Sequence, residues 1–183
     1  DVVVGLTASG RTPYVAGALA AARARGAMTV LITANPHAEL AGKVEHLLAV
    51  DTGPEVITGS TRLKAGTAQK LVLNSFSTAV MVRLGRTWSN LMVDMVATNA
   101  KLRGRVIRIL CEATGADELA ARHALERASG ELKPALLSLL AEVEPDVARV
   151  ALEHHQGSVA QALQYFRGHV QADFIGRGVN DRR

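Results

Sequence analysis

The sequence predicts an α/β fold with a parallel sheet, followed by a small all-helical domain. Two patterns predict this class. In the first half, short continuous runs of Val, Leu and Ile alternate with helical segments, which is typical of strands buried on both faces of a parallel sheet. After Gly85, only apolar periodicity of the helical kind recurs, so no further strand is expected. With 183 residues, the chain is long enough for one ordinary domain and a helical annex.

The first strand is predicted over Val2–Leu6, where three consecutive valines form a β-branched run. A helix follows it, with Thr12 at the N-cap, Pro13 at the first helical position and Gly26 just after the end. The second strand is predicted over Met28–Thr33, and an Asn-Pro pair ends it.

The next segment is predicted to hold a short helix near Ala38–Lys43, a third strand at His46–Val50, and a loop at Asp51–Gly59. A long helix is then predicted from Thr61 to Leu84. Strands and helices that alternate in this order imply a layered sheet with right-handed crossovers.

The second half is predicted to hold a long helix and then shorter amphipathic helices joined by connections marked by Gly or Pro. The predicted ranges are Asn90–Thr114, Asp117–Ala128, Glu131–Glu142, Pro145–His154 and Ser158–Phe166. The polar, glycine-containing remainder, Arg167–Arg183, is predicted to be frayed.

Composition excludes several classes of protein. The apolar fraction of 48% excludes disorder as the main state, and the 3% of aromatic residues leaves Ala, Val, Leu and Ile to form the core. The single cysteine, Cys111, excludes an intrachain disulfide scaffold, and no Cys/His pairs stand at metal-ligand spacing. The chain shows neither a membrane-spanning apolar run nor a basic stripe with interleaved aromatics. We therefore expect no metal, membrane or nucleic acid as partner, and a cytoplasmic location.

A hydroxyl-rich loop joins the end of the first strand to the first helix. Ser9 and Thr12 offer hydroxyls, and Gly10 lets the backbone come close to a ligand. The N–H groups of the first helical turn point to the same place and favour an anion. By itself this loop fits a phosphate site and a plain helix cap equally well, and it lacks the spacing of a nucleotide P-loop.

The segment that leads into the long helix is dense in polar and small residues. Ser60 or Thr61 can cap that helix. Arg62 and Lys64 lie in its first turn, where positive charge opposes the helix dipole and needs an anion or an acidic partner. Glu55 stands on a loop between two glycines, where it can face a cleft. We interpret these five residues together as a substrate pocket, although each alone reads equally as a solvated side chain.

These motifs carry a resemblance to a known family. Ser9-Gly10-Arg11-Thr12 resembles the second phosphate-binding loop of the sugar isomerase (SIS) fold, whose usual form is Ser-x-Ser-Gly-x-Thr, with Thr7 in place of the first Ser. Residues 53–70, followed by Asn74, resemble the signature shared by N-acetylmuramic acid 6-phosphate etherases and the glucokinase regulatory protein. Residues 90–102 look like the etherase helix that comes next.

The resemblance covers about residues 1–165 and implies a flavodoxin-like SIS sheet followed by a helical domain. It implies that Ser9, Gly10 and Thr12 bind the phosphate of a sugar phosphate. The implied divisions are residues 1–86 as the C-terminal part of the SIS domain, 87–115 as a long connecting helix, 116–166 as a small helical bundle and 167–183 as a disordered tail.

The implied reaction cleaves the D-lactyl ether of N-acetylmuramic acid 6-phosphate, giving N-acetylglucosamine 6-phosphate and D-lactate during the recycling of cell-wall sugars. Elimination followed by hydration is the implied mechanism, a carbon–oxygen lyase reaction without metal or organic cofactor. The resemblance also implies a homodimer, and apolar residues on more than one side of the 61–84 helix agree with it. A non-catalytic SIS module that senses sugar phosphates remains the alternative.

The resemblance leaves the catalytic residues outside this chain. In the etherase family, two catalytic glutamates and the first phosphate loop lie in an N-terminal half that would precede Asp1. The SIS sheet is therefore expected to be partial, and Glu55 to be a pocket or interface residue rather than the base. We expect the 183-residue chain alone to be inactive as an etherase.

Overall fold

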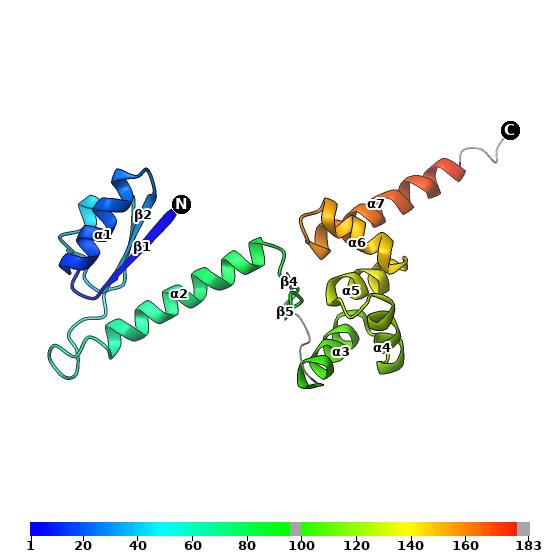
Figure 1. The fold of residues 1–183 in the computed structure, drawn as a ribbon, viewed down its shortest axis with the longest axis horizontal. Helices are drawn as coiled ribbons and strands as arrows, with labels where there is room; N and C mark the ends of the chain where they lie inside the picture. Colours follow the sequence, from blue (N-terminus) through cyan, green and yellow to red (C-terminus); the bar gives the residue numbers. More distant parts are fainter. Residues whose placement is uncertain (96–99, 179–183) are drawn as a thin grey trace. The chain divides into compact units, whose positions relative to one another are not determined.

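The computed structural model describes residues 1–95 and 100–178 (Figure 1). The chain divides into two units, Asp1–Thr78 and Ala79–Arg183. The first unit is α/β with a parallel sheet and the second is mainly helical, so the predicted fold class is confirmed.

The sheet of the first unit contains three parallel strands in the order β1-β2-β3. They are β1 (Val2–Thr7), β2 (Met28–Thr33) and β3 (His46–Ala49). The predicted strands are confirmed, and β2 has the predicted bounds. Because all three strands run in the same direction, the loops after their C-terminal ends meet at one edge of the sheet.

Helix α1 (Pro13–Ala24) packs on one face of the sheet, as Figure 1 shows. Its buried side chains Val15 and Leu19 lie against Leu31 of β2, which is fully buried. Gly5 of β1 is required at this contact, because a Cβ atom there would lie 2.7 Å from Cγ1 of Val15. The small core of this unit therefore lies between α1 and the sheet.

Helix α2 (Lys64–Arg83) is exposed along most of its length and runs from the first unit into the second. The short 3₁₀ helix η1 (Ala41–Lys43) lies between β2 and β3. Helix α2 begins at Lys64 rather than at the predicted Thr61, because hydrogen-bonded turns occupy the preceding residues. In one of them, the Leu63 N–H donates to the Ser60 carbonyl over 3.1 Å.

A two-stranded hairpin follows α2, so the expectation of no strand after Gly85 is wrong. Strands β4 (Thr87–Trp88) and β5 (Leu91–Met92) pair in antiparallel fashion. Ser89 makes the turn with a φ of 52°, and two-residue connections of hairpins favour positive φ. The strands are too short to produce a detectable alternation, which explains why a helix was predicted to begin in this region.

Asp94, just after the hairpin, connects it to helix α5 (Leu132–Ala141). Its carboxylate pairs with Arg86, and its Oδ1 lies 3.3 Å from Nζ of Lys133. Burial lowers the pKa of Lys133, and the positive charge of Arg86 adds to the effect. The hairpin and α5 are therefore joined by a charged cluster as well as by apolar contacts.

The remaining helices of the second unit follow the predicted order. They are α3 (Ala100–Thr114), α4 (Glu118–Arg127), α6 (Pro145–His154) and α7 (Val159–Gly178).

Two predicted boundaries in the second unit are wrong. Helix α3 begins at Ala100 rather than at Asn90, so no continuous connecting helix fills residues 87–115; residues 96–99 lie outside the described part. Helix α7 continues to Gly178, through residues predicted to be frayed, and no proline interrupts it. Residues 179–183 also lie outside the described part.

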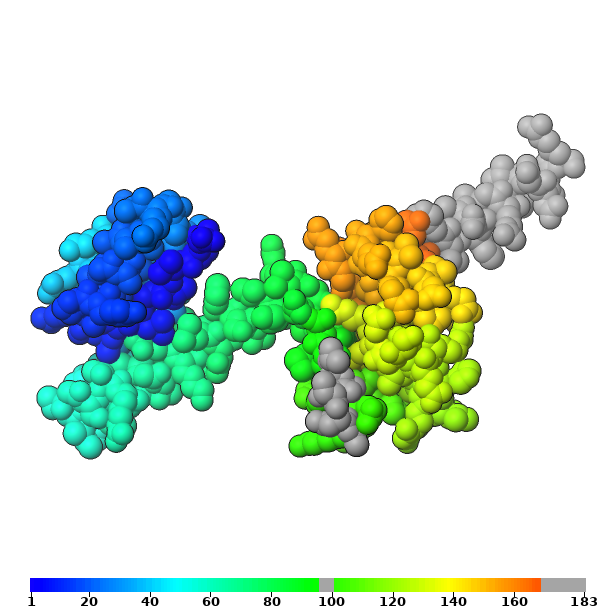
Figure 2. Space-filling view, viewed as in Figure 1, coloured from blue at the N-terminus to red at the C-terminus, as the bar shows by residue number. Residues whose placement is uncertain are grey.

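The helical unit has a core of aliphatic side chains, as the low aromatic content predicts. Figure 2 shows helices α3, α4, α5 and α6 and the beginning of α7, coloured green to orange, packed together. Its fully buried large side chains are Val93, Val106, Leu110, Leu136, Leu137 and Val159. Among the helices that the structure describes, none has the length and apolar content needed to cross a membrane.

Candidate functional site

A cleft of about 290 Å³ lies in the first unit, at the edge where the parallel strands end. Its walls come from the loops after β1, β2 and β3 and from the start of α2. Ligands of open parallel sheets bind at this edge. The lining residues are Ala8, Ser9, Ala34, Thr52, Gly53, Pro54, Glu55, Thr58, Gly59, Thr61 and Ala65.

Three of the predicted site residues, Ser9, Glu55 and Thr61, line this cleft together. The other predicted residues do not line it: Gly10, Thr12, Ser60, Arg62 and Lys64. The two sequence motifs thus meet at one place, although only part of each faces the cavity.

The loop after β1 is organised by a pair of hydroxyls. Oγ1 of Thr7 lies 2.7 Å from Oγ1 of Thr12, and Thr7 Oγ1 also accepts the Gly10 N–H over 3.2 Å. Thr12 occupies the N-cap position of α1 as predicted, but its side chain does not cap the helix. The Thr12 hydroxyl bonds to the buried Thr7 instead, so the free N–H groups at the start of α1 are left for another acceptor.

Glu55 caps helix α2, a role that the sequence assigned to Ser60 or Thr61. Its Oε2 accepts the Lys64 N–H over 2.9 Å, and its Oε1 accepts the Ala65 N–H over 3.0 Å. These bonds, that of Ala65 first, lower the pKa of Glu55, and the Lys64 charge lowers it further. Glu55 is therefore the acidic partner that Lys64 in the first turn of α2 requires. Arg62 precedes the helix, so its predicted place in that turn is wrong.

Glu55→Gln is expected to destabilise the first unit at neutral pH and to matter less in acid. The folded carboxyl has a pKa below its ordinary value of 4.5. Its stabilisation is therefore complete above pH 4.5 and is lost as the pH falls through the folded pKa. Denaturant unfolding of both proteins at neutral and acidic pH measures the difference, and an NMR titration of the Ala65 amide proton reports the pKa.

Glu39→Gln provides the control for this experiment. Glu39 is an exposed carboxylate in the same unit, 3.9 Å from Arg11, and exposed ion pairs contribute little to stability. A Glu55→Gln protein as stable as the unmodified chain at neutral pH contradicts the capping role. A titration midpoint at or above 4.5 for the Ala65 amide contradicts it as well.

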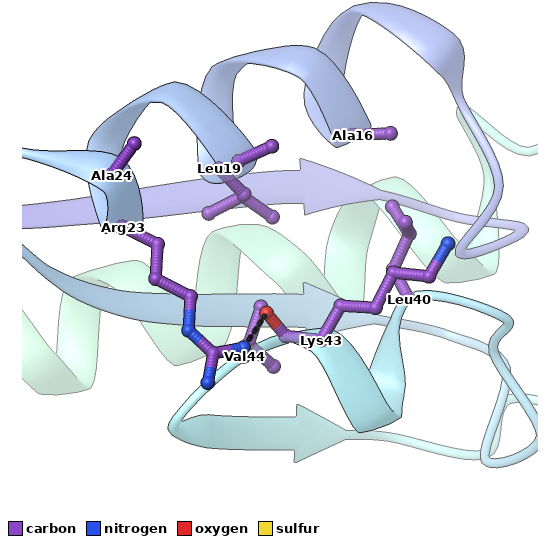
Figure 3. Close-up of a pocket in the computed structure, with 8 residues that line it drawn as sticks. Ala16, Leu19, Arg23, Ala24, Leu40, Lys43 and Val44 are labelled. Carbon is purple, nitrogen blue, oxygen red and sulfur yellow. Dashed lines mark hydrogen bonds between the residues drawn. The ribbon is translucent and has the colours of Figure 1, made fainter.

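A second pocket of the first unit, about 430 Å³ in volume, lies between α1 and η1 (Figure 3). Leu19, Leu40 and Val44 make its wall apolar, and the Arg23 guanidinium reaches across to donate to the Lys43 carbonyl over 3.4 Å. None of the side chains that line this pocket carries a hydroxyl group. We therefore place the candidate site in the cleft beside Ser9. Among the described residues, no three His, Cys, Asp or Glu side chains are grouped to hold a metal ion.

Comparison with known proteins identifies the class of the first unit. Residues 1–79 match the SIS domain family, which confirms the class indicated by the parallel sheet and the hydroxyl-rich loop.

Relatives that align with most of this chain are named N-acetylmuramic acid 6-phosphate etherase. The protein from Thermobifida fusca (strain YX) is 66% identical over 140 residues, which are 76% of this chain and 46% of that protein. Those from Pectobacterium atrosepticum and Rubrobacter xylanophilus are 54% and 57% identical over 163 residues, 89% of this chain and 54% of each relative. The predicted resemblance is confirmed: the chain is a homologue of these etherases and spans about half their length.

Proposed function

We propose that this chain supplies the sugar-phosphate-binding part of an N-acetylmuramic acid 6-phosphate etherase. The proposed reaction is carbon–oxygen lyase chemistry that releases D-lactate and N-acetylglucosamine 6-phosphate in cell-wall sugar recycling. The observation that carries the proposal is a hydroxyl-rich loop at the N-terminus of α1, in a chain up to 66% identical to proteins of that name. A cytoplasmic location agrees with the single cysteine, Cys111, which is a free thiol.

In the proposed reaction, a base removes the C2 proton of the open-chain sugar, lactate leaves from C3 with the help of an acid, and water adds to the unsaturated aldehyde. The loop that contains Ser9, Gly10 and Thr12 would hold the phosphate, and so fix the position of C2 and C3. Thr61, which lines the same cleft as Ser9, is a candidate contact for the sugar. No metal or organic cofactor enters this scheme.

Glu55 is unsuited to the role of base. Both of its carboxylate oxygens accept backbone N–H groups of α2, and its pKa is lowered by those bonds. A good general base has a pKa near the working pH and a lone pair directed at the substrate. We therefore propose that Glu55 shapes the cleft by capping α2, and that Lys64 and Arg62 add positive charge near it.

Removing the loop hydroxyls is expected to weaken binding of N-acetylglucosamine 6-phosphate. A hydrogen bond to a charged group contributes about 1.5–3 kcal/mol, so Ser9→Ala and Thr12→Val should each bind about ten- to a hundredfold more weakly. Calorimetry on the chain measures the affinity for the sugar phosphate. N-acetylglucosamine, which lacks the phosphate, is the control ligand. Ser75→Ala, an exposed hydroxyl on α2, is the matched control. Unchanged affinity in both loop variants would show that the phosphate binds elsewhere.

A non-catalytic sugar-phosphate-sensing module is the second candidate function. It is favoured by the single carboxylate, Glu55, among the described residues that line the cleft, since elimination wants both an acid and a base. The sensor is favoured over the enzyme if the chain binds the sugar phosphate but releases no D-lactate, even after addition of the part of a relative that this chain does not match.

We also propose a second copy of this chain as a partner. Helix α2 leaves Leu71 and Phe76 exposed, at 62% and 57% of their surface, and a helix with apolar residues on several sides is normally covered. Sedimentation velocity at micromolar concentration is expected to show a dimer, and Phe76→Ser to shift it toward monomer. A monomer in the unmodified chain contradicts this proposal.

A further inference from the structure

Three successive carbonyl groups of the loop after β1, those of Ala8, Ser9 and Gly10, accept hydrogen bonds from residues 33–40, at the end of β2 and in the segment after it. The Ala8 carbonyl accepts the Ala34 N–H and the Thr33 hydroxyl, each over 3.2 Å. The Ser9 carbonyl accepts Nδ2 of Asn35 over 3.0 Å, and the Gly10 carbonyl accepts the Leu40 N–H over 3.2 Å. Three successive peptide groups are thus anchored on one side.

This anchoring sets the direction of the N–H groups. In a planar trans peptide, the C=O of one residue and the N–H of the next point in opposite directions. Holding the Ala8 and Gly10 carbonyls therefore turns the Ser9 and Arg11 N–H groups away from the 33–40 segment. Within the described part of the chain, these two N–H groups have no acceptor. Loops that present several N–H groups on one side form concave sites for anions.

The middle peptide group depends on a side chain rather than on backbone. Its carbonyl, that of Ser9, is held by the Asn35 amide, and its N–H, that of Gly10, donates to Oγ1 of Thr7 over 3.2 Å. That oxygen is in turn 2.7 Å from the Thr12 hydroxyl. If the peptide group rotated, its carbonyl would face the space where an anion binds, and the hydroxyl pair would lose its N–H donor.

Asn35 is itself held in a single orientation. Its Oδ1 accepts the His37 N–H over 2.9 Å, and its own N–H donates to Oγ1 of Thr33 over 3.2 Å. Pro36 restricts the backbone of the residue before it to extended conformations. The amide therefore has both oxygen and nitrogen engaged, and the donor side can face only the Ser9 carbonyl.

We propose that Asn35 is a positioning residue for the phosphate loop: its side-chain amide fixes the Ser9–Gly10 peptide group, so that the loop presents N–H groups and not a carbonyl to the anion. This inference rests on the proposed function of the loop as a sugar-phosphate site. Asn35 does not line the cleft, and its effect on the ligand passes through the peptide group.

The test compares Asn35→Ala and Asn35→Asp in the 183-residue chain, with N-acetylglucosamine 6-phosphate as the probe. Asn35→Ala loses the donor and is expected to bind on the order of tenfold more weakly at every pH, the fold-change that one hydrogen bond supports. Asn35→Asp keeps the shape, but an ionised carboxylate cannot donate to the Ser9 carbonyl and repels the anion. On acidification the carboxyl gains a proton and can donate again.

The decisive readout is the ratio of variant to unmodified affinity as the pH falls, because this ratio cancels the titration of the phosphate itself. The ratio for Asn35→Asp is expected to recover in acid, while that for Asn35→Ala stays flat; a loss of structure would not produce this difference. Circular dichroism checks the fold of each variant, and Asn90→Ala, which removes an amide from the helical unit, is the control.

The outcomes separate the two proposals. If Asn35→Ala and Asn35→Asp both bind the probe as tightly as the unmodified chain does, the positioning role is wrong and the phosphate site stands. If both variants bind weakly without recovery of Asn35→Asp in acid, the donated hydrogen bond is not the cause and the inference is overturned. If the unmodified chain does not bind the sugar phosphate, both proposals are overturned.

Discussion

Gly10→Ala is expected to remove measurable binding of N-acetylglucosamine 6-phosphate. Gly10 has a φ of +72°, in the left-handed region that costs other residues roughly 1–2 kcal/mol. A Cβ atom there would lie 2.1 Å from Cβ of Ala38 and 2.9 Å from its Cα, so the backbone itself must move. The residue that moves carries the N–H donor to Thr7 and lies between the two N–H groups that face the proposed anion.

Calorimetry measures the loss, with Gly17→Ala as the matched control. Gly17 lies within α1, and a Cβ atom there meets nothing within 4 Å. The control should bind normally and gain about 0.4–1 kcal/mol of stability. The double variant Gly10→Ala, Ala38→Gly removes the atom that the new methyl group hits, so it should recover part of the binding. Full affinity in the Gly10→Ala protein contradicts the assignment of this loop.

Much of the fold could be predicted because its signals are local. The valine run in β1 and the apolar run in β2 identify buried strands without knowledge of their neighbours. Thr12 and Pro13 likewise mark the start of α1 within two residues. The hydroxyl-rich loop follows from these two elements, because a loop between a parallel strand and a helix must lie at the ligand-binding edge.

The hydrogen-bond partners of Glu55 and Glu45 could not be predicted, because each carboxylate binds groups in another element of the fold. The Glu55 carboxylate binds backbone N–H groups of Lys64 and Ala65, and no side-chain pattern marks a backbone partner. Glu45 similarly accepts the Thr29 hydroxyl and, over 2.8 Å, the Thr29 N–H, and these two bonds, that of the hydroxyl first, lower its pKa. The sequence shows only that both glutamates lie in connections between the predicted elements.

The part of the site that sequence reasoning missed is the support beneath the loop. Thr33 and Asn35 sit at the end of a predicted strand, where the Asn-Pro pair reads simply as a strand breaker. Their contacts with the Ala8 and Ser9 carbonyls depend on the parallel pairing of β1 with β2. One signal could have identified them. It is a polar residue directly after the strand that pairs with the strand leading into the phosphate loop.

No D-lactate is expected when the 183-residue chain is incubated with N-acetylmuramic acid 6-phosphate, even where it binds the sugar phosphate. Elimination needs a base at C2 and an acid at the departing oxygen, and each such group contributes about 10²–10⁴-fold. The carboxylate that lines the cleft, Glu55, has both oxygens bound to N–H groups of α2. With its pKa lowered by those bonds, it is ionised at neutral pH and weakly basic.

An enzymatic assay of D-lactate measures the result, and the full-length Thermobifida fusca relative, treated in the same way, is the positive control. Glu55→Gln in the short chain separates the possible sources of any activity. Lactate release that disappears in Glu55→Gln would mean that Glu55 leaves its cap to act as the base, and its assignment here would be wrong. Release that persists in Glu55→Gln would place the acid and base on other residues of this chain. Uncatalysed ether cleavage is slow, so either kind of release would be visible against a blank without protein. Because the Glu55 carboxylate is occupied as a cap, we expect measurable binding of the sugar phosphate without release of D-lactate.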